Sequence, residues 1–247
     1  CGEPADVVHV RNVLACAADP HDVIEGLHAL VKETGVAVIE VPYVKDLVDH
    51  VEFDMIYHEH QCYFSLTSLV ALVGRHRLTV QGVERVPQSG GSLRVFVGRR
   101  DVVSPRVGKL LDEEAAWGVH RAEFYAALGQ RIERLRRELT ELLGRLKAEG
   151  RRIVGYGASA KGASLLNYCR IGSDTLEFVV DRNTLKQGRY TPGAHLKVYS
   201  PQKLVEEQPD YVLLLSWNLA DEILAQQSAY RQHGGRFIIP LPSLKVA

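Results

Sequence analysis

A strand that turns through glycines into a helix constrains the fold of this chain more than any other stretch. The segment reads Arg152-Ile153-Val154-Gly155-Tyr156-Gly157-Ala158-Ser159-Ala160-Lys161. Further strand-like segments follow at residues 176–181, 210–217 and 236–240, and helical patterning runs from about Leu219 to Gln232. Because strands and helices alternate, the second half predicts an α/β domain with a parallel sheet and right-handed crossovers.

The first half carries α/β patterning of its own. Its strand-like runs are Asp6–Val10, Val36–Val41, Leu78–Val86 and Ser92–Gly98. The last two, joined by a glycine-rich turn, predict an antiparallel hairpin at a sheet edge. Asp19-Pro20 predicts the start of a helix, and we expect Gly35 to end it. Ser65 predicts the start of a second helix.

A charged helical stretch separates these two α/β patterns. Apolar residues recur on one helical face between Gln130 and Leu146. A helix packed on a domain is favoured over a coiled coil, because the heptads do not persist. The predicted domains are therefore residues 1–104, a helical connector at residues 105–150, and residues 151–247.

Composition excludes several classes of function. The formal net charge is zero, so no bulk field attracts nucleic acid or an anionic membrane, and we expect neither as a partner. The four cysteines lie far apart without a C-x-x-C pair, which argues against a metal site in this chain and favours a reducing cytoplasm. The chain opens on Cys1 and not on Met. We therefore expect that the N-terminal part of a longer protein is missing.

The glycine turn is the first candidate ligand site. A strand that turns through Gly155 and Gly157 into a helix directs backbone N–H groups and a positive helix end at an anion. Lys161 adds a charge, and Asp181 ends the next strand, where a dinucleotide fold places its ribose-binding acid. The spacing is G-x-G-x-x-x-x-G and not G-x-G-x-x-G, so a purely structural turn stays an alternative.

The second candidate is a polar loop between a strand and a helix of the first half. Tyr57, Glu59 and His60 form an acid/base set in which a histidine base has a carboxylate partner and a phenol can donate to an oxyanion. A metal site on His58 and His60 is the weaker interpretation, because no third ligand follows at a suitable spacing.

Taken together, the motifs resemble those of the S-adenosylmethionine-dependent sugar C-methyltransferases, which act on nucleotide-linked deoxysugars. The matching segments, in order, are Asn12-Val13-Leu14-Ala15, Ile39-Glu40-Val41-Pro42-Tyr43, Phe53-Asp54, Tyr57-His58-Glu59-His60, Tyr63-Phe64-Ser65, Gly90-Gly91-Ser92-Leu93-Arg94, Gly155-Tyr156-Gly157-Ala158 with Lys161, Thr191-Pro192-Gly193 and Ser216-Trp217-Asn218. The resemblance covers nearly the whole chain.

The resemblance implies an architecture and a set of ligands. The chain would supply the remainder of a class I methyltransferase sheet, followed by a Rossmann-like three-layer domain that holds a nucleotide-sugar, such as a dTDP-ketosugar. S-adenosylmethionine would be the cofactor, with Asn12 as a contact. Any zinc is expected only in the cysteine-rich segment that precedes this part of the family's sequence. Substrate contacts are implied at Tyr43, Cys16, Gly155, Gly157, Lys161, Asp181, Trp217 and Asn218.

The resemblance also implies a mechanism. His60 would remove a proton next to a keto group, Glu59 would support it, and Tyr57 would donate a hydrogen bond to the sugar or enolate. Cys16 is a departure, since the family usually has histidine there. Two alternatives stay open: an NAD-dependent oxidoreductase that uses the glycine turn, and a nucleotide-sugar-binding module without catalysis.

Overall fold

The computed structural model describes residues 3–247, apart from the side chain of residue 89. Contacts divide the chain into two compact units. Unit 1 is Cys1–Asp49 with His58–Leu128, and unit 2 is His50–Tyr57 with Gly129–Ala247. The predicted catalytic loop therefore straddles the division, since Tyr57 ends a segment of unit 2 and His58 begins a segment of unit 1.

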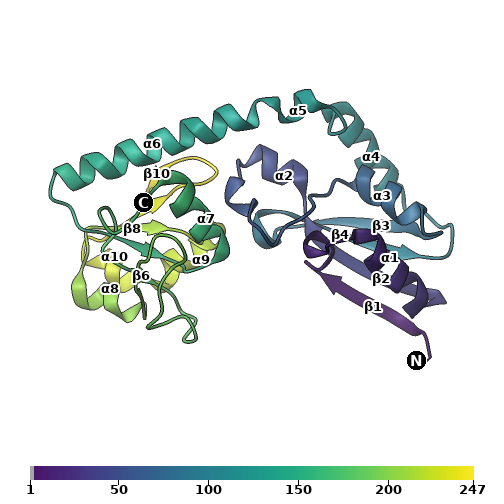
Figure 1. Ribbon diagram of the computed structural model, residues 1–247, viewed down its shortest axis with the longest axis horizontal. Helices are drawn as coiled ribbons and strands as arrows, with labels where there is room; N and C mark the ends of the chain where they lie inside the picture. The colour runs from purple at the N-terminus through teal and green to yellow at the C-terminus, as the bar shows by residue number, and fades with distance from the viewer. Residues whose placement is uncertain (1–2) are drawn as a thin grey trace. The chain divides into compact units, whose positions relative to one another are not determined.

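Unit 1 is built on a mixed sheet with the strand order β1-β2-β4-β3 (Figure 1). Its elements are β1 (Ala5–Arg11), a 3₁₀ turn (Leu14–Cys16), α1 (Pro20–Leu30), β2 (Val31–Pro42), α2 (Val44–Asp49), α3 (Leu66–Gly74), β3 (Thr79–Val86), β4 (Ser92–Gly98), α4 (Pro105–Trp117) and α5 (Ala122–Ala126). β1 and β2 are parallel, whereas β4 is antiparallel to both β2 and β3. The predicted hairpin at a sheet edge is confirmed, because β3 ends the strand order.

Local signals account for the helix starts of unit 1. The Asp19 carboxylate accepts a hydrogen bond from His21 N, with Pro20 at the first helical position of α1. Ser65 and Ser68 form a reciprocal capping box at the start of α3. α1 packs on β1 and β2, and α3 and α4 pack on β3, so these caps direct both helices onto the sheet.

The expectation that Gly35 ends the first helix is wrong. α1 ends at Leu30, and β2 already begins at Val31. Gly35 lies inside β2, where a Cβ atom would come within 2.8 Å of the carbonyl oxygen of Ala5 in β1. The β1–β2 register shifts beside this point. Strand pairing therefore overrode the helical spacing, and the glycine permits the close approach of two backbones.

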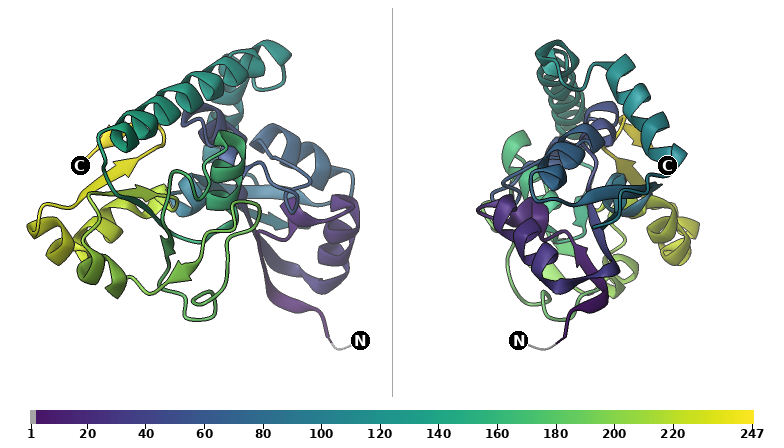
Figure 2. Two further views of the ribbon diagram at one scale, coloured as in Figure 1. Left: turned by 60° about the vertical axis from the view of Figure 1, so that its left-hand side comes forward. Right: turned by 90° about the vertical axis from the view of Figure 1, so that its right-hand side faces the viewer.

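Unit 2 contains a mostly parallel sheet, drawn in green to yellow in Figure 2. Its strand order is β10-β9-β8-β5-β6-β7. Its elements are a 3₁₀ turn (Phe53–Met55), α6 (Leu128–Ala148), β5 (Ile153–Tyr156), α7 (Ala160–Cys169), β6 (Val179–Val180), β7 (Val198–Tyr199), α8 (Gln202–Glu207), β8 (Tyr211–Leu214), a 3₁₀ turn (Trp217–Leu219), α9 (Ala220–Gln226), α10 (Ser228–Gln232), β9 (Arg236–Ile239) and β10 (Lys245–Val246). β10 alone among the described strands of this sheet runs antiparallel to its neighbour. The predicted α/β class is confirmed.

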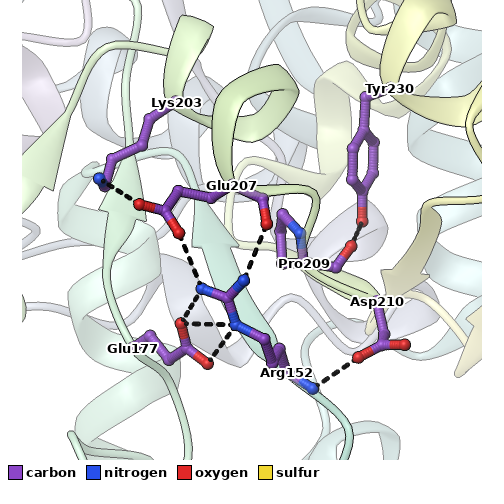
Figure 3. Close-up of polar contacts among 7 residues, drawn as sticks. All are labelled: Arg152, Glu177, Lys203, Glu207, Pro209, Asp210 and Tyr230. Atoms are coloured by element: carbon purple, nitrogen blue, oxygen red, sulfur yellow. Dashed lines mark hydrogen bonds and ion pairs between the residues drawn. The ribbon is translucent and has the colours of Figure 1, made fainter.

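The amino-terminal edge of this sheet is held by a polar network (Figure 3). Arg152, which precedes β5, donates from Nε and Nη2 to Glu177 at 2.7–3.2 Å, and its Nη2 also reaches Glu207 at 3.1 Å. Its backbone N–H donates to Asp210 Oδ2 at 2.8 Å. The network joins the chain ahead of β5, β6 and β8, so the opposite, carboxyl-terminal edge is left for ligands.

The helical connector predicted at residues 105–150 contributes to both units. α4 and α5 are part of unit 1, and from Gly129 onward α6 is part of unit 2. The buried positions of α6 are Leu135, Leu139, Leu143 and Leu146, which lie on one helical face as the sequence spacing predicts. The three-part domain division stays a prediction.

Candidate active site

In unit 1 the loop that contains Glu59 and His60 is bound to the segment that contains Cys16. The backbone N–H groups of Gln61 and Cys62 both donate to Ala15 O, at 2.8 and 3.2 Å. Gln61 Nε2 donates to His58 O at 2.7 Å, which closes the loop on itself. The predicted base and the cysteine that replaces the expected histidine are therefore carried by two segments that contact each other directly.

Glu59 acts electrostatically on Cys16. Partial burial and the nearby Glu59 carboxylate raise the pKa of the Cys16 thiol above its ordinary value of 9.0. The thiol is therefore protonated near neutral pH and does not act as a base. The His60 ring packs edge-on against Tyr63, with ring centroids 6.1 Å apart. The role of His60 as the base stays a prediction.

The predicted contacts Asn12 and Tyr43 both follow a strand of the parallel pair β1–β2. Asn12 directly follows β1, adopts a left-handed backbone (φ 56°) and donates its N–H to Glu40 O at 2.9 Å. Tyr43 directly follows β2, is buried, and donates its hydroxyl to Glu114 at 2.8 Å. Asn12 thus lies at a carboxyl-terminal sheet edge that suits a ligand, whereas the Tyr43 hydroxyl is engaged in the core.

The glycines in β5, in the turn after it and in α7 are required by close packing in unit 2. Gly157 has a φ of +102°, and a Cβ atom there would lie 2.2 Å from Ser216 Oγ. At Gly162 in α7, a Cβ atom would lie 2.8 Å from Leu215 Cβ. A Cβ atom at Gly155 would lie 3.0 Å from Val179 Cγ2. The turn therefore brings α7 and the end of β8 closer to β5 than any other residue type permits.

Asp181 supports the shape of this turn. Its Oδ2 accepts from Ala158 N, and its Oδ1 accepts from Asn183 N, both at 2.7 Å. Lys186 Nζ donates to Ala158 O at 2.7 Å and lies 3.7 Å from Asp181 Oδ2. The predicted ribose-binding acid thus already holds two loops together. Each carboxylate oxygen retains further acceptor capacity for a hydroxyl group.

A cavity of about 410 Å³ opens at the carboxyl-terminal edge of this sheet. It lies where the strand order reverses around β5, a position at which open α/β sheets bind ligands. Its lining includes Tyr156, Gly157, Asp181, Arg182, Asn183 and Ser216. The buried Tyr156 hydroxyl has no hydrogen-bond partner among the described residues, although the Gln227 amide lies nearby.

Lys161 and Trp217 belong to a second polar cluster of unit 2. The Lys161 ammonium lies 4.4 Å from the centroid of the Trp217 ring. Trp217 Nε1 donates to Asp54 Oδ2 at 2.6 Å, and both side chains are buried. Lys161 also interacts electrostatically with the carboxylates of Asp54 and Glu52. Asn218, by contrast, is exposed.

Sequence reasoning assigned no role to Asp54 or Glu52. Both side chains are buried, at 0% and 2% exposure, and burial raises the pKa of each. The sequence did contain one indication of this burial, because the acid Asp54 stands between the apolar residues Phe53 and Met55. Such an acid is expected to be buried and paired.

Residues 3–247 contain neither a metal-binding cluster nor a membrane-spanning helix. No group of three or more His, Cys, Asp or Glu side chains in that range is arranged to hold a metal ion. No helix in the same range is long and apolar enough to cross a bilayer. The described cysteines Cys16, Cys62 and Cys169 are free thiols, and Cys1 lies outside the described residues.

Comparison with known proteins gives concordant matches along the chain. A family model described as the C-methyltransferase C-terminal domain matches residues 87–242. A model described as a methyltransferase domain matches residues 2–81. The C-methyltransferase NovU of Streptomyces niveus is 38% identical over 245 residues, which are 98% of this chain. The chain spans 58% of the length of that relative.

Proposed function

Because this chain belongs to the C-methyltransferase family, we propose that it forms part of an S-adenosylmethionine-dependent enzyme that methylates a carbon of a nucleotide-linked ketosugar. The observation that carries the proposal is the match to a C-methyltransferase along 98% of the chain. The acid/base set Tyr57, Glu59 and His60 is complete within it. We place the reaction in the cytoplasm.

The chemistry proposed for this chain is proton transfer and charge stabilisation. His60 accepts the proton from the carbon next to the ketone, and the electron pair of that C–H bond forms an enolate. Tyr57 donates a hydrogen bond to the developing oxyanion, and Glu59 supports the protonated histidine. S-adenosylmethionine, when bound, would supply the methyl group: the new C–C bond to the enolate carbon would form as the C–S bond of the sulfonium breaks, with a neutral thioether as the leaving group.

Cofactor contact is proposed at Asn12. Its position directly after β1, at the carboxyl-terminal edge of the parallel pair, suits a polar ligand atom. No glycine-rich turn follows β1 in the sequence, which continues Asn12-Val13-Leu14. Asn12 is thus the one contact to this cofactor that we propose after β1.

The nucleotide is proposed to bind in the unit 2 cavity. Its volume of about 410 Å³ suits a nucleoside with part of a diphosphate. Asp181 can accept from a ribose hydroxyl, whereas the backbone N–H groups of Gly155 and Gly157 already donate to Phe178 O and Val180 O at 2.9 and 2.8 Å. Thymidine diphosphate is the proposed nucleotide.

The test is methyl transfer by the full-length protein to a dTDP-ketosugar, followed by mass spectrometry of the sugar. Wild type should add one methyl group per sugar. His60→Ala should lower kcat by about 10²–10⁴-fold, the usual contribution of a general base. His58→Ala is the matched control, because His58 is an exposed neighbour in the same loop. Equal activity of wild type and His60→Ala would remove His60 from the mechanism.

The second candidate is a binding module that takes up nucleotide-sugar without methylating it. Cys16, which stands where the family usually has histidine, favours this alternative. It predicts binding of thymidine diphosphate with no methyl transfer at any substrate concentration. Binding together with turnover would exclude it.

A further inference from the structure

The short segment His50–Tyr57 packs in unit 2, although the rest of that unit begins only at Gly129. His50–Tyr57 belongs to unit 2, whereas the residues on either side of it belong to unit 1. Within unit 2, the 3₁₀ turn Phe53–Met55 contacts α7. The Phe53 ring packs on Tyr168 of α7, with ring centroids 5.0 Å apart. This segment ends in Tyr57, the proposed oxyanion donor.

Asp54 provides the polar attachment of that segment. Its Oδ2 accepts a buried hydrogen bond of 2.6 Å from Trp217 Nε1. Its Oδ1 is buried without a hydrogen-bond partner among the described residues. Packing alone does not explain a carboxylate here, because a buried ion contributes less net stability than an apolar pair of the same shape. The carboxylate instead fixes the direction of its contact with Trp217 and the distance between donor and acceptor.

The charge of Asp54 is balanced within the same cluster. The Lys161 ammonium interacts with both Asp54 and Glu52, and it also lies over the face of the Trp217 ring. The same indole therefore contacts a cation through its face and a carboxylate through its edge, both favourable for its charge distribution. His50 Nδ1 lies 3.3 Å from Glu52 Oε1 at the start of the segment.

Trp217 also lies next to the proposed nucleotide cavity. Ser216, its chain neighbour, lines that cavity, as does Leu219 at the end of the same 3₁₀ turn. Asp54 precedes Tyr57 by only three residues. The Asp54–Trp217 bond is thus a direct connection between the wall of the cavity and the segment that carries Tyr57.

We propose that Asp54 is a positioning residue: its hydrogen bond to Trp217 holds the Tyr57 segment in the place required for enolate stabilisation. This inference rests on the proposed function, since it assigns Asp54 to the same reaction. Asp54 acts through Tyr57 and does not contact the substrate. Losing the bond therefore affects the chemical step and not the affinity for nucleotide.

The test compares Asp54→Leu, which has no hydrogen-bond acceptor in its side chain, with wild type in the full-length protein. We expect kcat to fall by about 10²-fold, the usual cost of a misplacement near 1 Å. The Kd for thymidine diphosphate should stay within threefold of wild type. An unchanged kcat in an active protein would overturn this inference alone, and a wild type without methyl transfer would overturn the proposed function with it. A loss of both kcat and nucleotide affinity would also overturn this inference, because a general structural defect predicts that result.

Trp217→Phe is the second variant, because it removes the indole donor and keeps an aromatic face for Lys161. It should lower kcat as much as Asp54→Leu does, and the double variant should be no slower than either single variant. Additive losses would show independent roles and would overturn the proposal.

A spectroscopic measurement keeps the test independent of activity. The chain has two tryptophans, so two indole N–H signals are expected by NMR. The Trp217 signal should lie downfield, because its partner is a carboxylate, and should move upfield in Asp54→Leu. A Trp217 signal that does not move would show that the bond is absent in solution.

Discussion

The indole N–H of Trp217 donates to Asp54 Oδ2 over 2.6 Å, and the two residues are 163 positions apart. The contact is buried. Together with the packing of Phe53 on Tyr168, it attaches the His50–Tyr57 segment to unit 2. Titratable groups surround this contact, among them Glu52, His50 and Lys161. The stability of this region therefore depends on pH.

Glu52→Gln should stabilise the protein above neutral pH. Burial, opposed by Lys161 and His50, raises the pKa of Glu52 from 4.5 to about 7. An acid with a raised pKa in the folded state favours folding below pH 4.5, and that contribution is lost as the pH rises to about 7. Glutamine stays neutral, so we expect a gain on the order of 1–3 kcal/mol at pH 8 and little change at pH 4.5.

Thermal unfolding at the two pH values measures this difference. Glu206→Gln serves as the control, because Glu206 is an exposed glutamate of the same unit. The control should shift Tm by less than Glu52→Gln does at pH 8. A lower Tm for Glu52→Gln at pH 8 would mean that the ionised carboxylate is stabilising, contrary to the prediction.

Gly157→Ala should destabilise unit 2 and close part of the cavity. A left-handed φ costs an L-residue about 1 kcal/mol, and the overlap of Cβ with Ser216 Oγ adds about 1–3 kcal/mol. Gly188→Ala is the matched control, because its φ is +81° and nothing lies within 4 Å of an added Cβ atom. Urea titration measures the free energy of unfolding of the two variants, and the comparison with wild type gives the loss of stability in each.

Removing the Ser216 side chain should rescue this variant. The overlapping atoms are Ser216 Oγ and Cβ, at 2.2 and 2.9 Å from the added Cβ. The Gly157→Ala/Ser216→Gly double variant should therefore lose less stability than the sum of the two single variants. Additive losses would show that the overlap is relieved by movement elsewhere.

The sequence predicted the family and the α/β class correctly, for identifiable reasons. Strong local signals, such as the Asp19-Pro20 start of α1 and the glycine turn after β5, are confirmed in the structure. The short strands β7 and β10 were not predicted, because two residues carry no usable periodicity. Gly35 was misassigned because local spacing contains no information about the approach of β1.

The site was harder to predict than the fold. The Asp54–Trp217 contact depends on tertiary packing between two segments that share no sequence pattern. Neither residue therefore indicates the contact in the sequence. Asp181 was predicted from its position at the end of a strand, and the structure adds that Ala158 N and Asn183 N donate to it. The catalytic roles of Tyr57, Glu59 and His60 stay predictions for the experiments above.

Glu114→Ala should strongly destabilise unit 1. The buried Glu114 carboxylate accepts from Tyr43 Oη, Leu66 N, and both the N–H and the hydroxyl of Thr67, at 2.5–2.8 Å. Two of these donors are backbone N–H groups at the start of α3, where a negative charge is favourable. Each buried donor left without a partner costs about 1–3 kcal/mol, so we expect a loss of at least about 3 kcal/mol. Urea unfolding measures it.

Tyr43→Phe is the control for the Glu114 prediction. It removes one of the donors and leaves the carboxylate with the others, so the expected loss is about 1 kcal/mol. A loss as large as that of Glu114→Ala would place the main stabilising contact on the tyrosine hydroxyl and would contradict the role assigned to the start of α3.

Cys16→Ala should change turnover far less than His60→Ala does. Partial burial and the Glu59 carboxylate raise the pKa of the Cys16 thiol above 9.0, so near pH 7 the thiol is neutral and cannot remove a proton. We expect kcat within about threefold of wild type, against the ~10²–10⁴-fold loss expected for a general base. Cys16→His introduces a group that titrates near pH 6.5, and the Glu59 charge favours its protonated form. A second ionisation should then enter the pH profile of kcat/KM below neutral pH. A large loss in Cys16→Ala, with His60→Ala still active, would transfer the base from His60 to the Cys16 position.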